Sequence, residues 1–196
     1  MKLTIMRFAA FATVASFAGA ASAFTLITFA DPSSGPANPL FNFSGGIGDT
    51  GQLTGGWMTT GLFLQTPGLG APDFVDAKFT VRDPINVVNG LAGAGNIDFF
   101  DSTNNPLFTI SFSSASYNVT SFGGAELVGN DINFSGPIIP GGLDQFAFAF
   151  AFANQTLVGN ELQMTSSFTS SAVPEPATMT ALGLGLAAVV ARRRRK

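Results

Sequence analysis

Large apolar residues alternate with small or polar residues through most of the middle of this chain. The clearest run is Phe146 to Phe152, in which four phenylalanines alternate with three alanines. A period of two places successive side chains on opposite faces of a strand, so this run predicts a central strand with one bulky and one small face. Asn154 to Asn160 predicts a turn, and Leu162 to Ser170 predicts the partner strand.

The same alternation, interrupted by clusters of turn-forming residues, predicts further strands. These expected elements are a strand at Lys78 to Arg82 ended by Asp83-Pro84, a hairpin of Ile97 to Asp101 with Leu107 to Ser113, and a hairpin of Glu126 to Val128 with Ile132 to Phe134. Short strands joined by Gly- and Asn-rich turns predict an all-β fold. We expect an antiparallel β-sandwich of jelly-roll type over residues 24–172, flanked by an N-terminal signal helix and a C-terminal hydrophobic helix.

The first 23 residues have the pattern of a secretory signal peptide. Lys2 and Arg7 precede the apolar stretch Phe8 to Ala20, and the small residues Ala21 and Ala23 end the segment. This order predicts cleavage by signal peptidase after residue 23. The alternative, a membrane anchor, is disfavoured because the stretch is shorter than the roughly 20 apolar residues that span a bilayer.

The last 24 residues form a tail of three parts. Val173-Pro174-Glu175-Pro176 is a stiff extended segment, because proline fixes its own φ and disfavours helix in the residue before it. Residues 177–191 carry no charge and are rich in Ala, Leu and Gly, and Arg192-Arg193-Arg194-Arg195-Lys196 closes the chain. The basic cluster is expected to stay cytoplasmic as a stop-transfer signal, which leaves residues 24–172 outside.

This tail resembles the PEP-CTERM protein-sorting signal of exported bacterial proteins. The resemblance covers Val173 to Lys196 and implies that an exosortase processes the tail at its Pro-Glu-Pro motif. It implies also that residues 177–191 hold the chain transiently in the inner membrane. Proteins with this signal accompany exopolysaccharide production, so the resemblance implies a structural or adhesive role at the cell surface or in the extracellular matrix. The alternative for the tail is an ordinary membrane anchor.

Composition excludes several kinds of chemistry. The chain has no Cys and no His, which rules out disulfides, His-dependent nucleophilic catalysis, and zinc or iron centres that need these ligands. Residues 24–172 contain Lys78 and Arg82 against 11 acidic residues, a net charge of −9. Because this charge repels phosphate, no nucleic-acid partner is expected.

Carboxylates are the remaining groups for acid–base chemistry. Asp73 with Asp76 and Asp98 with Asp101 are each three residues apart, which places the two members on opposite faces of a strand. Neither pair therefore forms a local catalytic site, and no residue is nominated as catalytic. The enzymatic alternative is a secreted glycoside hydrolase, which needs two carboxylates facing each other across a sugar. Glu126 and Glu161 remain candidates for such a pair.

Two ligand predictions come from individual residues. Trp57 lies among glycines and could contact a glycan, as in a carbohydrate-binding module, although a single tryptophan is also typical of a core. The oxygen-rich segments Asp101 to Asn105 and Asn130 to Asn133 could hold structural calcium, but turn capping explains both without metal. No other cofactor is expected. Gly46 to Gly51 matches G-x-G-x-x-G without a following helix, and so predicts a Gly-rich hairpin.

Overall fold

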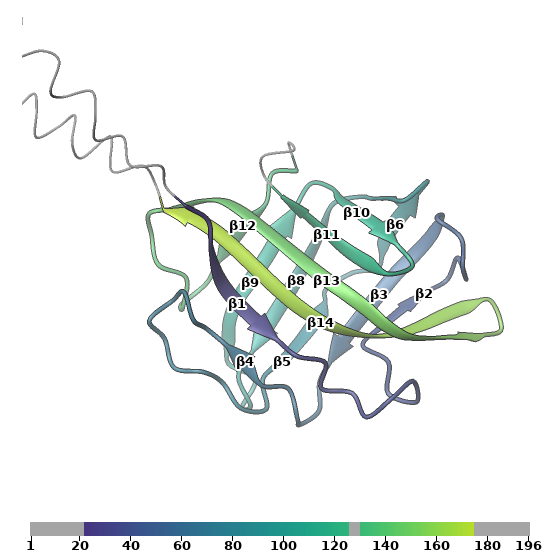
Figure 1. The fold of residues 1–196 in the computed structure, drawn as a ribbon, viewed down its shortest axis with the longest axis horizontal. Coiled ribbons are helices and arrows are strands. Elements are labelled where there is room, and N and C mark those ends of the chain that lie inside the picture. The colour runs from purple at the N-terminus through teal and green to yellow at the C-terminus, as the bar shows by residue number, and fades with distance from the viewer. Residues whose placement is uncertain (1–21, 126–129, 175–196) are drawn as a thin grey trace, which may run out of the picture. The chain divides into compact units, whose positions relative to one another are not determined.

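Strands built on the predicted alternation make up the regular secondary structure of the described residues. The structure is a computed structural model that describes residues 22–125 and 130–174, and within it Ala23–Val173 form one compact unit. The strands are β1 (Phe24–Phe29), β2 (Phe41–Phe43), β3 (Gly51–Trp57), β4 (Leu64–Gln65), β5 (Lys78–Val81), β6 (Ile85–Val88), β7 (Leu91–Ala92), β8 (Gly95–Phe100), β9 (Pro106–Phe112), β10 (Ala115–Asn118), β11 (Ser121–Ala125), β12 (Asn133–Ser135), β13 (Leu143–Val158) and β14 (Glu161–Pro174) (Figure 1).

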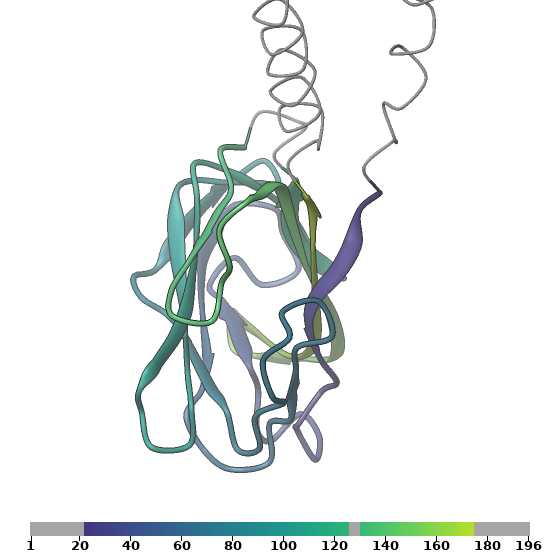
Figure 2. The ribbon, with the colours of Figure 1, turned by 90° about the vertical axis from the view of Figure 1, so that its left-hand side faces the viewer.

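Eight of these strands close into an antiparallel barrel, in the hydrogen-bonded order β3, β6, β7, β10, β11, β13, β14 and β2. The three-residue β2 closes the ring, because Phe43 pairs with Leu162 of β14 on one side and with Leu53 of β3 on the other. Figure 2 shows the strands curving round a common interior. The all-β class is confirmed, but the predicted β-sandwich of jelly-roll type is wrong.

The reason for this error is physical. Period-two alternation fixes which side chains face inward, but it is the same for a strand in a sandwich and a strand in a closed barrel. Closure depends here on β2, which is only three residues long and is too short to show a pattern of its own. The sequence predicts the signal helix within residues 1–23 and the C-terminal helix at residues 177–191. They fall on segments 1–21 and 175–196, which lie outside the described residues.

Four further strands extend the sheet beyond the barrel on the β3 side. Gly51 to Leu53 of β3 pair with β6 inside the barrel, whereas Gly56 and Trp57 pair with β5. From β5 the sheet continues through β8 and β9 to β12, and we call β5, β8, β9 and β12 the wing. On the β14 side, β1 and then β4 extend the sheet (Figure 1).

Phenylalanine rings fill the interior, as the alternation predicts. All four phenylalanines of the run in β13 are buried, and Phe150 is fully enclosed. The ring of Phe150 lies 4.7 Å from that of Phe168 and 5.0 Å from that of Phe41, measured between centroids. Such distances are typical of favourable aromatic pairs. Phe79 joins the wing to this cluster, since its centroid is 6.0 Å from that of Phe150.

The predicted hairpins have three different outcomes. The β8–β9 and β2–β3 hairpins are confirmed by their pairing. The β13–β14 hairpin is confirmed too, but β13 continues to Val158, so that the predicted turn at Asn154 is part of the strand. The predicted pairing of Ile132 to Phe134 with Glu126 to Val128 is not supported, because β12 pairs with β9; residues 126–129 lie outside the described residues.

Candidate functional site

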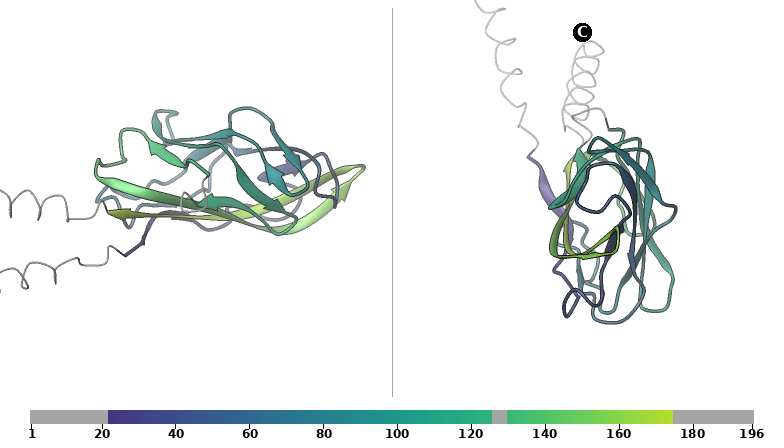
Figure 3. Two further views of the ribbon diagram at one scale, coloured as in Figure 1. Left: turned by 90° about the horizontal axis from the view of Figure 1, so that it is seen from above. Right: turned by 90° about the vertical axis from the view of Figure 1, so that its right-hand side faces the viewer.

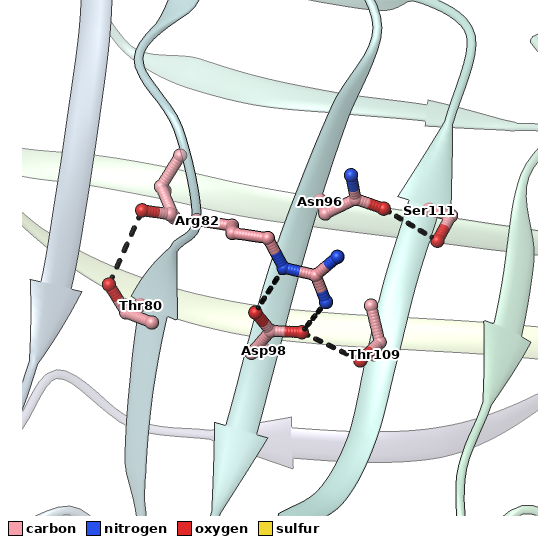
Figure 4. A network of polar contacts seen from close by, with 7 residues as sticks. Thr80, Arg82, Asn96, Asp98, Thr109 and Ser111 are labelled. Carbon is pink, nitrogen blue, oxygen red and sulfur yellow. Dashed lines mark hydrogen bonds and ion pairs between the residues drawn. The ribbon is translucent and has the colours of Figure 1, made fainter.

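The outer face of the wing carries polar side chains in register on three neighbouring strands (Figure 4). Asp98 of β8 lies opposite both Thr80 of β5 and Thr109 of β9, and Asn96 lies opposite Ser111. The alternation that buries Phe79, Ile97 and Ile110 turns these residues outward. We call this set the polar array; its members are Thr80, Arg82, Asn96, Asp98, Thr109 and Ser111.

Hydrogen bonds fix the side chains of the polar array. The Arg82 guanidinium donates two hydrogen bonds to the Asp98 carboxylate, from Nε to Oδ2 at 2.8 Å and from Nη2 to Oδ1 at 2.6 Å. The Thr109 hydroxyl donates to Asp98 Oδ1 at 2.7 Å, and the Ser111 hydroxyl donates to Asn96 Oδ1 at 2.8 Å. Hydrogen bonds from Arg82, and then from Thr109, hold the pKa of Asp98 below its ordinary value despite partial burial. Asp98 therefore stays charged and paired.

A hollow of about 360 Å³ adjoins the polar array. Asn96 and Ser111 belong to both, and Asp83 and Asp131 bring two carboxylates to its wall. The apolar part of the lining includes Phe112. A volume of this size is within the range of pockets that bind small ligands.

A second depression lies on the small-residue face of β13 and its neighbours. Its volume is about 420 Å³, and its lining includes Ala147 and Ala149 of β13 with Thr169 and Ser171 of β14. This is the small face that alternation with phenylalanine predicts. Its lining combines small side chains and hydroxyls with Phe122 and Phe148, and includes no charged group.

Asp73 and Asp76, one of the aspartate pairs considered in the sequence, form separate hydrogen bonds with the backbone. Asp73 accepts a hydrogen bond from the Thr66 amide, and Asp76 accepts one from the Gly61 amide. Each carboxylate therefore stabilises a different part of the segment between β3 and β5. Glu161 lies at the start of β14. Glu126 lies outside the described residues.

The first segment proposed for calcium is satisfied by its own donors. Asp101 Oδ1 accepts hydrogen bonds from the Thr103 amide and hydroxyl and from the Asn105 amide, each at 2.8 Å, and Oδ2 accepts one from the Asn105 side chain. These bonds, chiefly those from Asn105, lower the pKa of Asp101 to about 2. The segment is therefore a turn capped by Asp101.

In the second segment, Asn130 accepts hydrogen bonds from another part of the chain. Asn130 Oδ1 accepts a hydrogen bond from the Ser114 hydroxyl, and the Asn130 carbonyl accepts one from the Ser113 amide. Among the described residues, no group of three or more acidic side chains is placed to hold a metal ion.

Trp57 packs into the core instead of lying at a loop edge. Its side chain is only 8% exposed, and its indole Nε1 donates to the Thr60 carbonyl at 3.1 Å. Stacking on a sugar needs an exposed ring face, so this position lends no support to the predicted glycan contact. The Gly46 to Gly51 segment forms the β2–β3 connection, as predicted.

The predicted processing residues that the structure describes meet at one end of the sheet. β1 and β14 are antiparallel, and Phe24 lies opposite Ala172. Figure 3 shows the purple strand β1 beside the yellow-green strand β14. Ala23 precedes the first strand, and Val173 and Pro174 end the last one. The other predicted sorting residues lie outside the described residues: Ala21, Glu175, Pro176, the segment 177–191, and Arg192, Arg193, Arg194, Arg195 and Lys196. In the part of the chain that the structure describes, no helix has the length and apolar character to cross a membrane.

The tail carries a known sorting motif. Residues 172–196 match the PEP-CTERM protein-sorting motif, which confirms the resemblance seen in the sequence. The motif indicates a protein that is exported through an exosortase system, processed by an exosortase, and sorted to the cell surface. Comparison with curated proteins and with solved structures gives no match.

The sequence did not single out the polar array or its hollow as a site. Each strand shows a polar pair two residues apart, such as Asn96 and Asp98 or Thr109 and Ser111. Pairs of this kind are typical of any outward strand face. The site depends on strand register, which brings Arg82 to Asp98 across 16 residues and is not visible in the sequence pattern. Asp83 and Asp131, from two separate connections, line the same hollow.

Proposed function

We propose that this exported protein is a structural or adhesive component of the extracellular matrix, associated with exopolysaccharide and without catalytic activity. The observation that carries the proposal is the position of the sorting motif, which begins at residue 172, inside the last strand of the sheet. The part delivered by sorting is therefore the barrel with its wing. Before processing, residues 177–191 would hold the chain in the inner membrane.

The arrangement of the described acids supports a role without catalysis. Asp98 is paired with Arg82, and Asp101 caps a turn. Asp73 and Asp76 accept hydrogen bonds from backbone amides. A carboxylate hydrolase needs one acid with a raised pKa facing a second carboxylate. The shifted aspartates in the described part of the chain, Asp98 and Asp101, both have lowered pKa values. We expect no new reducing ends when the purified protein is incubated with its host's exopolysaccharide.

Cell fractionation in the native host tests the proposal. We expect the wild-type chain in the washed extracellular matrix, and a variant with alanine at Pro174, Glu175 and Pro176 in the membrane fraction. The matched control replaces Pro137 and Pro140, two exposed prolines of a surface loop, with alanine and should reach the matrix normally. Wild-type protein that stays in the cytoplasm, or that the matrix does not retain, would contradict the proposal.

A carbohydrate-binding module is the second candidate function. The observation that favours it is the hollow beside the polar array, in which Asp83 and Asp131 join Asn96 and Ser111. Carboxylate, amide and hydroxyl groups on a sheet face are suited to the hydroxyls of a sugar, because they provide both donors and acceptors. This function uses a different site from Trp57.

A further inference from the structure

The polar array continues across the whole width of the wing. Asn133 of β12 lies opposite Ser111, and Ser135 lies opposite Thr109. Two cross-strand rows therefore run across the outer face, one through Asp98 and the other through Asn96. Adjacent strands are about 4.8 Å apart, so each row offers a polar group at a regular short spacing. A surface with this repeat is suited to a ligand that itself repeats hydroxyl groups along a chain.

The side chains of the polar array are already ordered. Arg82 and Thr109 donate hydrogen bonds to the Asp98 carboxylate. The Ser111 hydroxyl donates to Asn96 Oδ1 and so orients the Asn96 amide. With Asn96 Oδ1 engaged, its amide nitrogen is directed away from that bond and offers two donors. Fixing side chains before binding lowers the entropy cost of binding. The array therefore presents ready-made donors and acceptors.

The charges of this surface select the kind of ligand. The Arg82 charge is matched by Asp98, whereas Asp83 and Asp131 line the adjoining hollow without an ion pair among the described residues. Free carboxylates accept strong hydrogen bonds from hydroxyl groups and repel anions. A neutral polyhydroxylated chain can donate hydrogen bonds to these carboxylates, whereas an anionic chain is repelled by them.

We propose that the polar array and its hollow bind a neutral polysaccharide. The Asp83 and Asp131 carboxylates accept hydrogen bonds from sugar hydroxyls in the hollow, and Asn96 and Ser111 form its junction with the array. The polysaccharide then continues along the two cross-strand rows, over β8 and β9. This inference deepens the proposed function, on which it rests, by naming the ligand and the surface that binds it.

Affinity electrophoresis tests the proposal with the protein purified from its native host, from whichever cell fraction contains it. The probes are the host's extracellular polysaccharide, separated into neutral and anionic fractions by anion exchange. We expect the neutral fraction in the gel to retard the wild-type protein and the anionic fraction to leave its mobility unchanged. Retardation should persist with EDTA in the gel, because the carboxylates bind hydroxyls directly.

Two variants locate the site. Asn96→Ala combined with Ser111→Ala should weaken retardation about tenfold, since the loss of two or three hydrogen bonds corresponds to roughly that factor in affinity. Asp131→Asn keeps the shape of the side chain and removes its charge, and should weaken binding severalfold. The matched control is Thr169→Ala combined with Ser171→Ala on the outer face of β14, which should bind as the wild type does. Circular dichroism checks that every variant is folded.

The outcomes separate this inference from the proposed function. Four results would each overturn the polysaccharide site. These are no retardation by the neutral fraction, equal retardation by the anionic fraction, loss of binding in EDTA, and equal effects of the site and control variants. A protein that reaches the matrix but shows any of these results keeps its proposed matrix role. A protein that binds the neutral fraction but is absent from the matrix contradicts the matrix role and keeps the binding site.

Discussion

The hydroxyl of Tyr117 is a polar atom buried in the barrel without a hydrogen-bond partner in the described part of the chain. The side chain is 3% exposed, and its ring lies 4.3 Å from that of Phe43 and 6.2 Å from that of Phe152, between centroids. Burial raises the pKa of this phenol above its ordinary value of 10.0, because the charged form would lose its hydration.

Replacing this residue by phenylalanine should stabilise the protein. Tyr117→Phe keeps the packing and removes a desolvated polar atom, so we expect the free energy of unfolding at pH 7 to rise by about 1 kcal/mol. Urea denaturation measures the change. The matched control is Phe152→Tyr, which adds a buried hydroxyl to the same cluster and should destabilise. A Tyr117→Phe variant less stable than the wild type would contradict this account.

The same hydroxyl makes stability depend on alkaline pH. Below pH 10 the phenol is neutral in both folded and unfolded states and adds no pH dependence. Above pH 10 the unfolded state loses the proton and the folded state keeps it, so stability falls as pH rises. Because the chain has a single tyrosine, absorbance at 295 nm reports Tyr117 alone. Phenolate should form only as the protein unfolds; phenolate in a protein that keeps its native circular dichroism would contradict the burial.

Gly123 illustrates a residue that the sheet requires to be small. A Cβ at this position would contact the carbonyl oxygen of Phe148 and lie 2.9 Å from the Ala149 Cα, both on the neighbouring backbone of β13. Gly123→Ala should therefore destabilise the protein by about 1–3 kcal/mol, as overpacking does. Gly141→Ala is the control, because nothing lies within 4 Å of its added Cβ and its stability should stay unchanged. Thermal unfolding compares the two, and equal midpoints would contradict the assigned β11–β13 packing.

At the scale of elements, the short strand β2 completes the barrel. β2 is three residues long, and its central residue Asn42 pairs with Gln163 of β14 and with Thr54 of β3. Opening β2 would convert a closed barrel into a sheet with two free edges. The stability of the barrel therefore depends on these few backbone hydrogen bonds as well as on its phenylalanine core.

A proline in β2 tests this role. Asn42→Pro removes a backbone donor and should destabilise the protein by about 3 kcal/mol or more. Asn42→Ala leaves the backbone donor in place and removes a side chain whose Oδ1 is buried without a partner in the described part of the chain, so it should cost far less. Hydrogen exchange should show faster exchange in β3 and β14 for the proline variant alone. Unchanged protection in both strands would contradict closure through β2.

The sequence predicts the elements better than their arrangement. Alternation from Phe146 to Phe152 correctly places the bulky face of β13 inside, and turn residues at Ser102 to Pro106 correctly place the β8–β9 hairpin. Pairing between distant strands has no local signal, so the closing contact of β2 with β14 and the partner of β12 were not predictable. Trp57 shows a similar limit at the residue level, because glycine neighbours do not determine whether its ring is exposed.

The candidate site depends on the same distant pairing. Arg82 and Asp98 are visible as charged residues in two predicted strands, but only the register of β5 against β8 joins them. Asp83 and Asp131 are 48 positions apart in the numbering, in two connections that meet at the hollow. The tail is different, because Pro174-Glu175-Pro176, the apolar segment and the basic cluster follow one another in the chain. A motif that is continuous in sequence can be recognised without a structure.

At the scale of the whole molecule, the sheet brings the two processing junctions together. Phe24 and Ala172 are opposite one another in β1 and β14, so the residue after the predicted signal-peptide cleavage and the first residue of the sorting motif are neighbours. Both ends of the sorted part therefore lie in one pair of hydrogen-bonded strands, β1 and β14. We expect the exported product to keep both strands intact, because each is the other's partner.

The most direct test of the central claim is the intact mass of the protein recovered from the washed extracellular matrix of its native host. The account predicts a species in that fraction that begins at Phe24 and lacks residues 177–196. Recovery of protein that still carries residues 177–196 at the surface would contradict processing by an exosortase. Absence of the protein from the matrix, with the full chain in the cytoplasm, would contradict the account as a whole.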